Sequence, residues 1–182
     1  MGTQSAKWWE RRSNLLPYDG LLQGIEDTCV YASIAGAVNY VAGKKVWMTS
    51  SLRDEWNRNG PRQPSFGVAS IAVTPYASEI EYIHHHTGDR KIALSIDSIK
   101  SVIEEDGLVI LSMELGDGLK KRQTRFHMFT LIARTADGFQ VWDTNGFQGI
   151  LTDQEIMGGF EYPDGTTYLP HSDEDTLIMR RK

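Results

Sequence analysis

The chain has 182 residues, of which 40% are hydrophobic and 24% are charged, and its formal net charge at pH 7 is −5. This length and composition predict one globular domain over residues 1–182, with residues 1–20 as a lead-in segment, and exclude a fibrous or wholly disordered protein. The acidic balance argues against a nucleic-acid partner, and the lack of an apolar run near the ~20 residues of a spanning helix argues against a membrane partner.

The N-terminal residues lack the apolar core of a secretory signal, and Ala6 stands where a myristoylation motif needs Ser or Thr. The single cysteine, Cys29, leaves no internal disulfide, which fits a reducing compartment. We therefore expect a cytoplasmic protein, or one that is exported without a conventional signal peptide and delivered into a host cell. The sequence gives no basis for predicting an oligomeric state.

The first part of the chain reads as a lead-in segment followed by a helix. The apolar side chains of residues 1–20 are expected to lie across the core: Trp8, Trp9, Leu15, Leu16 and Tyr18. Residues 29–42 are small or apolar on nearly every side. This pattern predicts a helix that is buried all round and ends at Gly43.

Three more helices are predicted downstream. A short one covers residues 51–60. The next begins at Thr74-Pro75, because Thr74 is a suitable cap and Pro75 fits the first turn, and it runs to about residue 86. The last covers residues 95–107, where the apolar side chains form one stripe at helical spacing: Ile96, Ile99, Val102 and Ile103.

The remaining chain changes to the periodicity of strands. Residues 107–115, 127–134 and 138–144 each read as a strand, with a turn around residues 135–138. A Pro-Asp-Gly turn follows within residues 162–170. Helices followed by antiparallel strands indicate an α+β fold.

The start of the first long helix is a suitable place for a reactive thiol. If Asp27 or Thr28 caps this helix, Cys29 lies in the first turn and faces backbone N–H groups that have no partner in the helix. A thiol nucleophile must lose its proton near neutral pH, although free cysteine titrates at about 8.5. The helix dipole and a nearby imidazolium both favour the thiolate.

His127 is the candidate for that imidazolium. It opens an apolar strand after a charged loop, so we expect it at a strand end near the surface. A carboxylate or amide must hold its ring in one tautomer, and both Asp143 and Asn145 lie at the far end of the next strand. A five-residue loop between the strands places Asp143 directly across from His127, whereas a three-residue loop makes Asn145 the nearer partner. A two-residue turn puts both candidates on the opposite face. Asp143 is the first choice and Asn145 its alternative.

In chain order, Gln23, Cys29, His127 and Asp143 resemble the papain-like cysteine peptidase superfamily. That family has a glutamine six residues before the nucleophile, a nucleophile that opens a buried central helix, and a histidine whose Asn or Asp partner lies on an adjacent strand. This chain matches these spacings. The stretch HMFTLIARTADGFQVWDTNG also resembles the histidine region of the bacteriocin-processing branch. No tryptophan follows Cys29, and Trp142 precedes Asp143 instead of following it, so the resemblance is to a divergent bacterial, viral or effector-like branch.

The resemblance implies a papain-like fold, with the buried nucleophile helix packed against the C-terminal antiparallel sheet. It implies a thiol protease, a hydrolase that cleaves a peptide bond through a thioester on Cys29. His127 would exchange the proton with the leaving group, and Asp143 would orient His127. The side chain of Gln23 and the backbone N–H of Cys29 would bind the oxyanion. No cofactor or metal is needed, and the expected partner is a protein or peptide substrate.

Two other functions stay open at this point. The same residues could serve deamidation, transglutamination, isopeptide removal from ubiquitin-like tags or acyl transfer, because each passes through the same thioester. The domain could instead be a non-catalytic binding module in which Cys29 is an ordinary thiol. A metal site at His84, His85 and His86 is not expected, because consecutive residues of a helix point ~100° apart and cannot share one ion.

Overall fold

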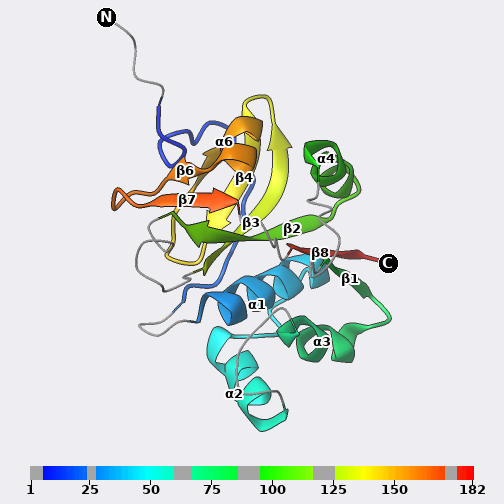
Figure 1. Cartoon of the computed structure of the whole chain (residues 1–182). Helices are drawn as coiled ribbons and strands as arrows, with labels where there is room; N and C mark the ends of the chain where they lie inside the picture. Colours follow the sequence, from blue (N-terminus) through cyan, green and yellow to red (C-terminus); the bar gives the residue numbers. More distant parts are fainter. Residues whose placement is uncertain (1–5, 24–27, 60–66, 86–94, 117–125, 171–175) are drawn as a thin grey trace, which may run out of the picture.

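The computed structural model describes residues 6–23, 28–59, 67–85, 95–116, 126–170 and 176–182. The described chain is a mixed fold of helices and an antiparallel sheet (Figure 1). Strands follow each other across the sheet in the order β1-β8-β2-β3-β4-β5, while β7 pairs with β2 and β6 pairs with β7. The strand bounds are β1 Ile80–His85, β2 Leu108–Leu115, β3 Phe126–Thr135, β4 Gly138–Asp143, β5 Gln148–Leu151, β6 Phe160–Glu161, β7 Thr167–Pro170 and β8 Thr176–Arg181.

Helices cover both faces of the sheet. Figure 1 shows α1 (Cys29–Ala42), α2 (Thr49–Asn59) and α3 (Val68–Val73) below it, and α4 (Ile96–Glu104) and α6 (Asp153–Gly158) above it. Side chains of a strand alternate between faces, so neighbours on β2 enter different cores. Ile110 packs with the α1–α3 layer, whereas Val109 and Leu111 pack with α4 and α6.

The predicted helix over residues 29–42 is confirmed as α1. It contacts β3 and β8 on one side and α2 and α3 on the other, which explains why apolar residues surround it on every side. The helix ends where Gly43 takes a left-handed φ of 67° and its N–H donates to the carbonyl of Tyr40 at 3.1 Å. Residues with a Cβ atom are strained at such a φ, whereas glycine is not, so glycine is the expected residue there.

The predicted helix from Thr74 to about residue 86 is wrong in its greater part. Thr74 and Pro75 do begin a helical turn, the 3-10 helix η1 (Thr74–Tyr76), but the chain then forms β1. Ile80 and Tyr82 alternate with more exposed residues and pack toward the α1–α3 layer. β1 pairs with β8, which comes almost a hundred residues later in the chain. Local cap signals cannot reveal such a distant partner, and the pairing overrides them.

The lead-in segment follows the edge of the sheet, and the prediction for it is only partly correct. Trp8 and Tyr18 are buried, and the carbonyl of Trp8 accepts a hydrogen bond from the N–H of Ile150 at 3.0 Å. Leu16 was expected to lie across the core, but 51% of its surface is exposed. Its backbone N–H and carbonyl are instead held by the side-chain amide of Gln140, both at 2.7 Å.

The predicted strands after residue 107 are confirmed as β2, β3 and β4, and the Pro-Asp-Gly turn joins β6 to β7. The helix predicted over residues 95–107 is present as α4, with Ser95 as its cap. Within the described residues, no helix has both the length and the apolar character that crossing a membrane requires.

Candidate functional site

Cys29 is the first residue of α1, as the sequence predicted, and it is half-buried. The carbonyl of Thr28 accepts the first helical hydrogen bond, from the N–H of Ala32 at 3.0 Å. No side-chain cap forms at Thr28, and Asp27, the other candidate cap, lies outside the described residues. The thiol therefore lies at the end of a 14-residue helix where backbone N–H groups have no helical partner, an environment that favours a negative charge.

The β3–β4 hairpin uses neither of the loop lengths that were favoured from sequence. Its turn has two residues, because Thr135 pairs with Gly138, and a regular hairpin of that kind would put Asp143 on the face opposite His127. A β-bulge at Ile132 corrects the register: Leu131 pairs with Val141, and Ala133 pairs with Gln140. Phe129 consequently pairs with Asp143, so Asp143 shares a face with His127 and lies diagonally across from it.

His127 and Asp143 are in direct contact. The Nε2 atom of His127 is hydrogen-bonded to Oδ1 of Asp143, a short contact between two side chains that are 8% and 0% exposed. The prediction that His127 lies near the surface is therefore wrong. Aromatic rings enclose it, with ring centroids 5.0 Å away for Phe129, 5.8 Å for Tyr168 and 6.2 Å for Tyr162.

Cys29 acts on the same imidazole, because it is among the groups that raise the pKa of His127. Since Nε2 serves Asp143, the other ring nitrogen, Nδ1, is the one left for the thiol. Burial is the largest single influence on the pKa of His127 and lowers it. Hydrogen bonds to Asp143 and Cys29, with the Coulombic attraction of these two groups, outweigh burial and raise the pKa of His127 to about 9. The protonated imidazole is thus the favoured form at neutral pH.

Asn145, the alternative partner for His127, has another role in the described structure. Its backbone N–H donates to Oδ1 of Asp143 at 3.2 Å, and its side-chain amide donates to the hydroxyl of Tyr162 at 2.8 Å. No hydrogen bond joins it to His127 within the described part of the chain. Its Oδ1 accepts a hydrogen bond from Nε2 of Gln23 at 2.7 Å.

Gln23 lies beside the end of β4. Its backbone N–H donates to the carbonyl of Thr144 at 2.9 Å, and its Oε1 accepts from the Thr144 hydroxyl at 2.8 Å. Together with the bond to Asn145, these contacts fix both ends of the Gln23 amide. Hydrogen bonds therefore link His127 to Asp143, and Gln23 to the two residues that directly follow Asp143, while Cys29 is among the groups that raise the pKa of His127.

Tyr162 was not found from the sequence. Its hydroxyl donates to Oδ2 of Asp143, and the carboxylate contact and burial both raise the pKa of this phenol, burial most strongly. Tyr162 precedes the Pro-Asp-Gly turn, and the turn was the only signal that the local sequence offered. Because Tyr162 comes 19 residues after Asp143 and reaches it through a separate hairpin, no spacing rule predicts the pair.

The imidazole of His127 can donate and accept a proton between the thiol of Cys29 and the buried carboxylate of Asp143.

Among the described residues, no cluster of three or more His, Cys, Asp or Glu side chains is placed to hold a metal ion. The helical basis given for His84 and His85 was wrong, because both belong to the strand β1 and not to a helix. His86 lies outside the described residues.

Comparisons with known proteins give little further information. No protein-family model matches the sequence, and the search of curated proteins found no match. Among solved structures, the chain is similar to the Pseudomonas avirulence protein AvrPphB, with 11% sequence identity and a TM-score of 0.35, over 83% of this chain and 91% of that chain. At this identity and TM-score, the similarity establishes neither the fold nor the function of this chain.

Proposed function

We propose that this chain is a papain-like cysteine peptidase, which cleaves an amide bond through a thioester on Cys29. The observation that carries the proposal is the position of one imidazole: the ring of His127 is hydrogen-bonded to Asp143, and Cys29 is among the groups that raise the pKa of the same ring. A thiol, an imidazole and a carboxylate linked in this order form the arrangement that nucleophilic catalysis by cysteine requires.

In the first half of the proposed reaction, the Cys29 thiolate attacks the carbonyl carbon of the substrate and a C–S bond forms. The carbonyl oxygen takes up the electron pair and becomes an oxyanion. When the tetrahedral intermediate collapses, the C–N bond breaks and the leaving nitrogen takes the proton held by His127. An amine departs, and the acyl group stays on Cys29 as a thioester.

In the second half, neutral His127 accepts a proton from a water molecule as the water attacks the thioester. The C–S bond breaks, the acid is released, and the thiolate–imidazolium pair is restored. Asp143 keeps its negative charge throughout, holds Nε2 and so keeps Nδ1 directed at Cys29.

The oxyanion would be bound by the backbone N–H of Cys29 and by the side-chain nitrogen of Gln23. A carboxamide nitrogen carries two hydrogens, and the bond to Asn145 uses one of them, which leaves one for the oxyanion. The contact between Gln23 Oε1 and Thr144 fixes which way the amide points. A donor held in place before the reaction loses no free energy to reorientation during it.

Two chemical probes test this proposal. Iodoacetamide alkylation of Cys29, followed by intact mass as a function of pH, should be fast and persist below pH 7 in the wild type, and this reactivity should disappear in His127→Ala. p-Nitrophenyl acetate should release one equivalent of p-nitrophenol in a burst that Cys29→Ala abolishes. A single rise in alkylation near pH 8.5, the ordinary value for a thiol, in both wild type and His127→Ala would reject the enzyme and favour a binding module.

The nature of the acyl acceptor then needs a separate assay, because the thioester is common to several reactions. Incubation with a peptide library and mass analysis of the products distinguishes them. Hydrolysis between residues gives two shorter peptides, deamidation converts a glutamine to a glutamate in place, and transfer joins the acyl group to an added amine. We expect the two shorter peptides.

A further inference from the structure

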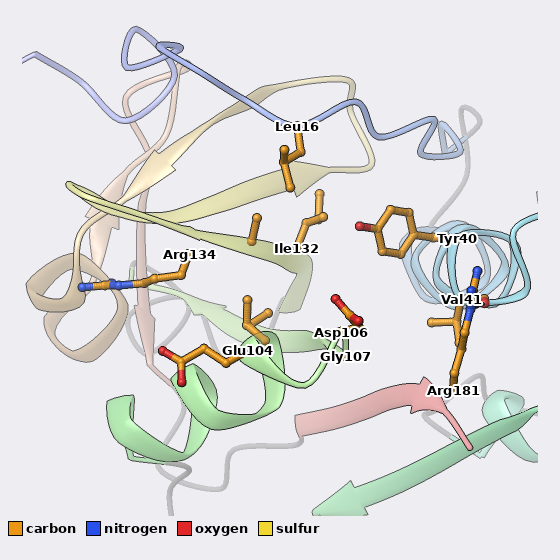
Figure 2. A pocket seen from close by; sticks show the side chains of 11 residues that line it. Leu16, Tyr40, Val41, Glu104, Asp106, Gly107, Ile132, Arg134 and Arg181 are labelled. Atoms are coloured by element: carbon orange, nitrogen blue, oxygen red, sulfur yellow. Dashed lines mark hydrogen bonds between the residues drawn. The ribbon is translucent and has the colours of Figure 1, made fainter.

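A pocket lies at the C-terminal end of α1, where Tyr40 and Val41 line it (Figure 2). Cys29 is at the other end of the same helix. The pocket has a volume of about 620 Å³, and volumes of about 300–1,000 Å³ are usual for small-molecule sites. Its walls come from five parts of the chain: the lead-in segment, the C-terminal end of α1, the bulged part of β3, the junction between α4 and β2, and the end of β8.

One side of the pocket is apolar and unusually exposed. Leu16 and Tyr40 belong to the few large apolar side chains that are exposed in the described structure, with 51% and 37% of their surface accessible. Both line this pocket, together with Val41 and the bulge residue Ile132. Figure 2 shows Leu16 above the opening and Tyr40 on the far side from Arg134, with the tyrosine hydroxyl pointing toward the middle.

The charged residues around the opening differ in whether another group of the protein already binds them. Arg134 donates to the carboxylate of Asp153 at 2.5 and 3.4 Å, and in Figure 2 its side chain extends away from the middle. The guanidinium of Arg181 uses Nε to bind the carbonyl of Val41 at 2.6 Å. Asp106 forms no hydrogen bond or ion pair with the described residues, and Figure 2 shows its carboxylate near the middle of the residues that line the pocket.

The backbone adds a negative contribution to that of the Asp106 carboxylate. The pocket lies beside the last turn of α1, where the helix dipole has its negative end. Asp106 also holds a left-handed backbone conformation, with φ of 57°, at the turn between α4 and β2. An aspartate that is fixed at a turn and lines the same pocket as an apolar wall is complementary to a ligand with a positive charge and an apolar body.

We propose that this pocket binds a small organic cation, in which an amine or amidine group pairs with Asp106 while an apolar body packs against Leu16, Tyr40 and Ile132. At 1.5 Å per residue, the helix separates Cys29 from Tyr40 by about 17 Å, so a ligand of this size does not cover the thiol. The site is therefore independent of the proposed peptidase.

Three probes that share one ring test the proposal: benzamidine, neutral benzyl alcohol and anionic benzoate. Binding is followed by the methyl NMR signals of Leu16 and Ile132 during titration of the whole chain. Benzamidine should shift both signals in a saturable way and bind about tenfold more tightly than benzyl alcohol. Benzoate should bind more weakly still. Alkylation of Cys29 should proceed at the same rate with and without saturating benzamidine.

Asp106→Asn supplies the matched variant, because asparagine adopts the left-handed conformation as readily as aspartate and should leave the turn intact. It should weaken benzamidine binding about fivefold and leave benzyl alcohol binding unchanged. Asp137→Asn, which removes one exposed carboxylate at the β3–β4 turn, should change neither. Equal affinity for all three probes, no saturable shift, or full benzamidine affinity in Asp106→Asn would overturn the proposal. None of these outcomes bears on the chemistry of Cys29.

Discussion

Tyr162 donates its phenolic hydrogen to Oδ2 of Asp143, while His127 occupies Oδ1 of the same carboxylate. A carboxylate that is 0% exposed thus has a donor on each oxygen. Burying a charge is costly unless hydrogen bonds replace the lost water, and Tyr162 supplies one of them. Its hydroxyl is in turn held by the side chain of Asn145 at 2.8 Å.

Tyr162→Phe should therefore lower the free energy of unfolding by about 1–3 kcal/mol at pH 7, because Oδ2 of Asp143 is left without its donor. Urea unfolding at pH 7 measures this loss. Tyr168→Phe is the control, since the Tyr168 hydroxyl forms no hydrogen bond with the described residues, and it should change stability by less than about 0.5 kcal/mol. An equal loss in both variants would contradict the role given to the Tyr162 hydroxyl.

His127 should stabilise the fold in a pH-dependent way. Its pKa in the folded state is about 9, above the ordinary 6.5, so the folded protein binds this proton more tightly than the unfolded chain does. The resulting stabilisation is complete below pH 6.5 and is lost as the pH rises through about 9. The destabilisation caused by His127→Gln should accordingly be larger near pH 6 than near pH 9.5, by roughly 1–3 kcal/mol. A loss that is constant across this range would contradict the raised pKa.

Asp143 and Asn145 should differ sharply in their effect on the thiol. Asp143→Asn removes the main contacts that raise the pKa of His127, so alkylation of Cys29 by iodoacetamide at pH 6 should slow at least about tenfold. Asn145→Ala leaves the contact between His127 and Asp143 in place, and the rate should change by less than about threefold. The reverse ranking would identify Asn145 as the third member of the site.

Gln23→Ala should slow one reaction of the Cys29 thiol and leave the rate of another nearly unchanged. Attack on p-nitrophenyl acetate develops an oxyanion, and loss of one donor to an oxyanion costs about 10²–10³-fold in rate. Alkylation by iodoacetamide develops no oxyanion at carbon, and its rate should stay within about twofold of the wild type. If both reactions slow equally, Gln23 acts by holding Asn145 and Thr144 rather than by binding the oxyanion.

The docking of the lead-in segment can be tested at Gly149. A Cβ added there would overlap the carbonyl of Trp8, whose hydrogen bond from Ile150 fixes the segment to β5. Gly149→Ala should cost roughly 2–4 kcal/mol in the free energy of unfolding. Gly158→Ala, at the end of α6, meets nothing within 4 Å and should be neutral or slightly stabilising. Similar stabilities for the two variants would mean that the segment is not held at Trp8.

Local patterns in the sequence were sufficient to predict α1, α4 and strands β2 to β4. Each of these elements has a clear period or a cap, and the small residues of α1 already indicated burial on every side. β1 was missed because its assignment depends on pairing with β8, and a cap signal at Thr74 suggested a helix instead. The sequence offers no local indication of a partner so far along the chain.

The candidate site also has a part that could be predicted from the sequence and a part that could not. Cys29, His127 and Asp143 stand at element ends that could be located from the sequence, so their proximity could be predicted. The residue that completes the environment of Asp143 could not, because Tyr162 arrives from a separate hairpin. The register was also out of reach, since a bulge leaves no reliable mark in the sequence and Ile132 is a common residue for a regular strand.

The bulge has a consequence for changes in chain length. Ile132 has no partner on β4, although its neighbours Leu131 and Ala133 pair with adjacent residues of that strand. A shortened chain that lacks Ile132 would close into a regular hairpin in which Phe129 still pairs with Asp143. Natural or engineered deletions at this point would thus spare the contact between His127 and Asp143 and remove one wall of the distant pocket. Loss of Ile132 alone would therefore change the pocket and leave the contact between His127 and Asp143 in place.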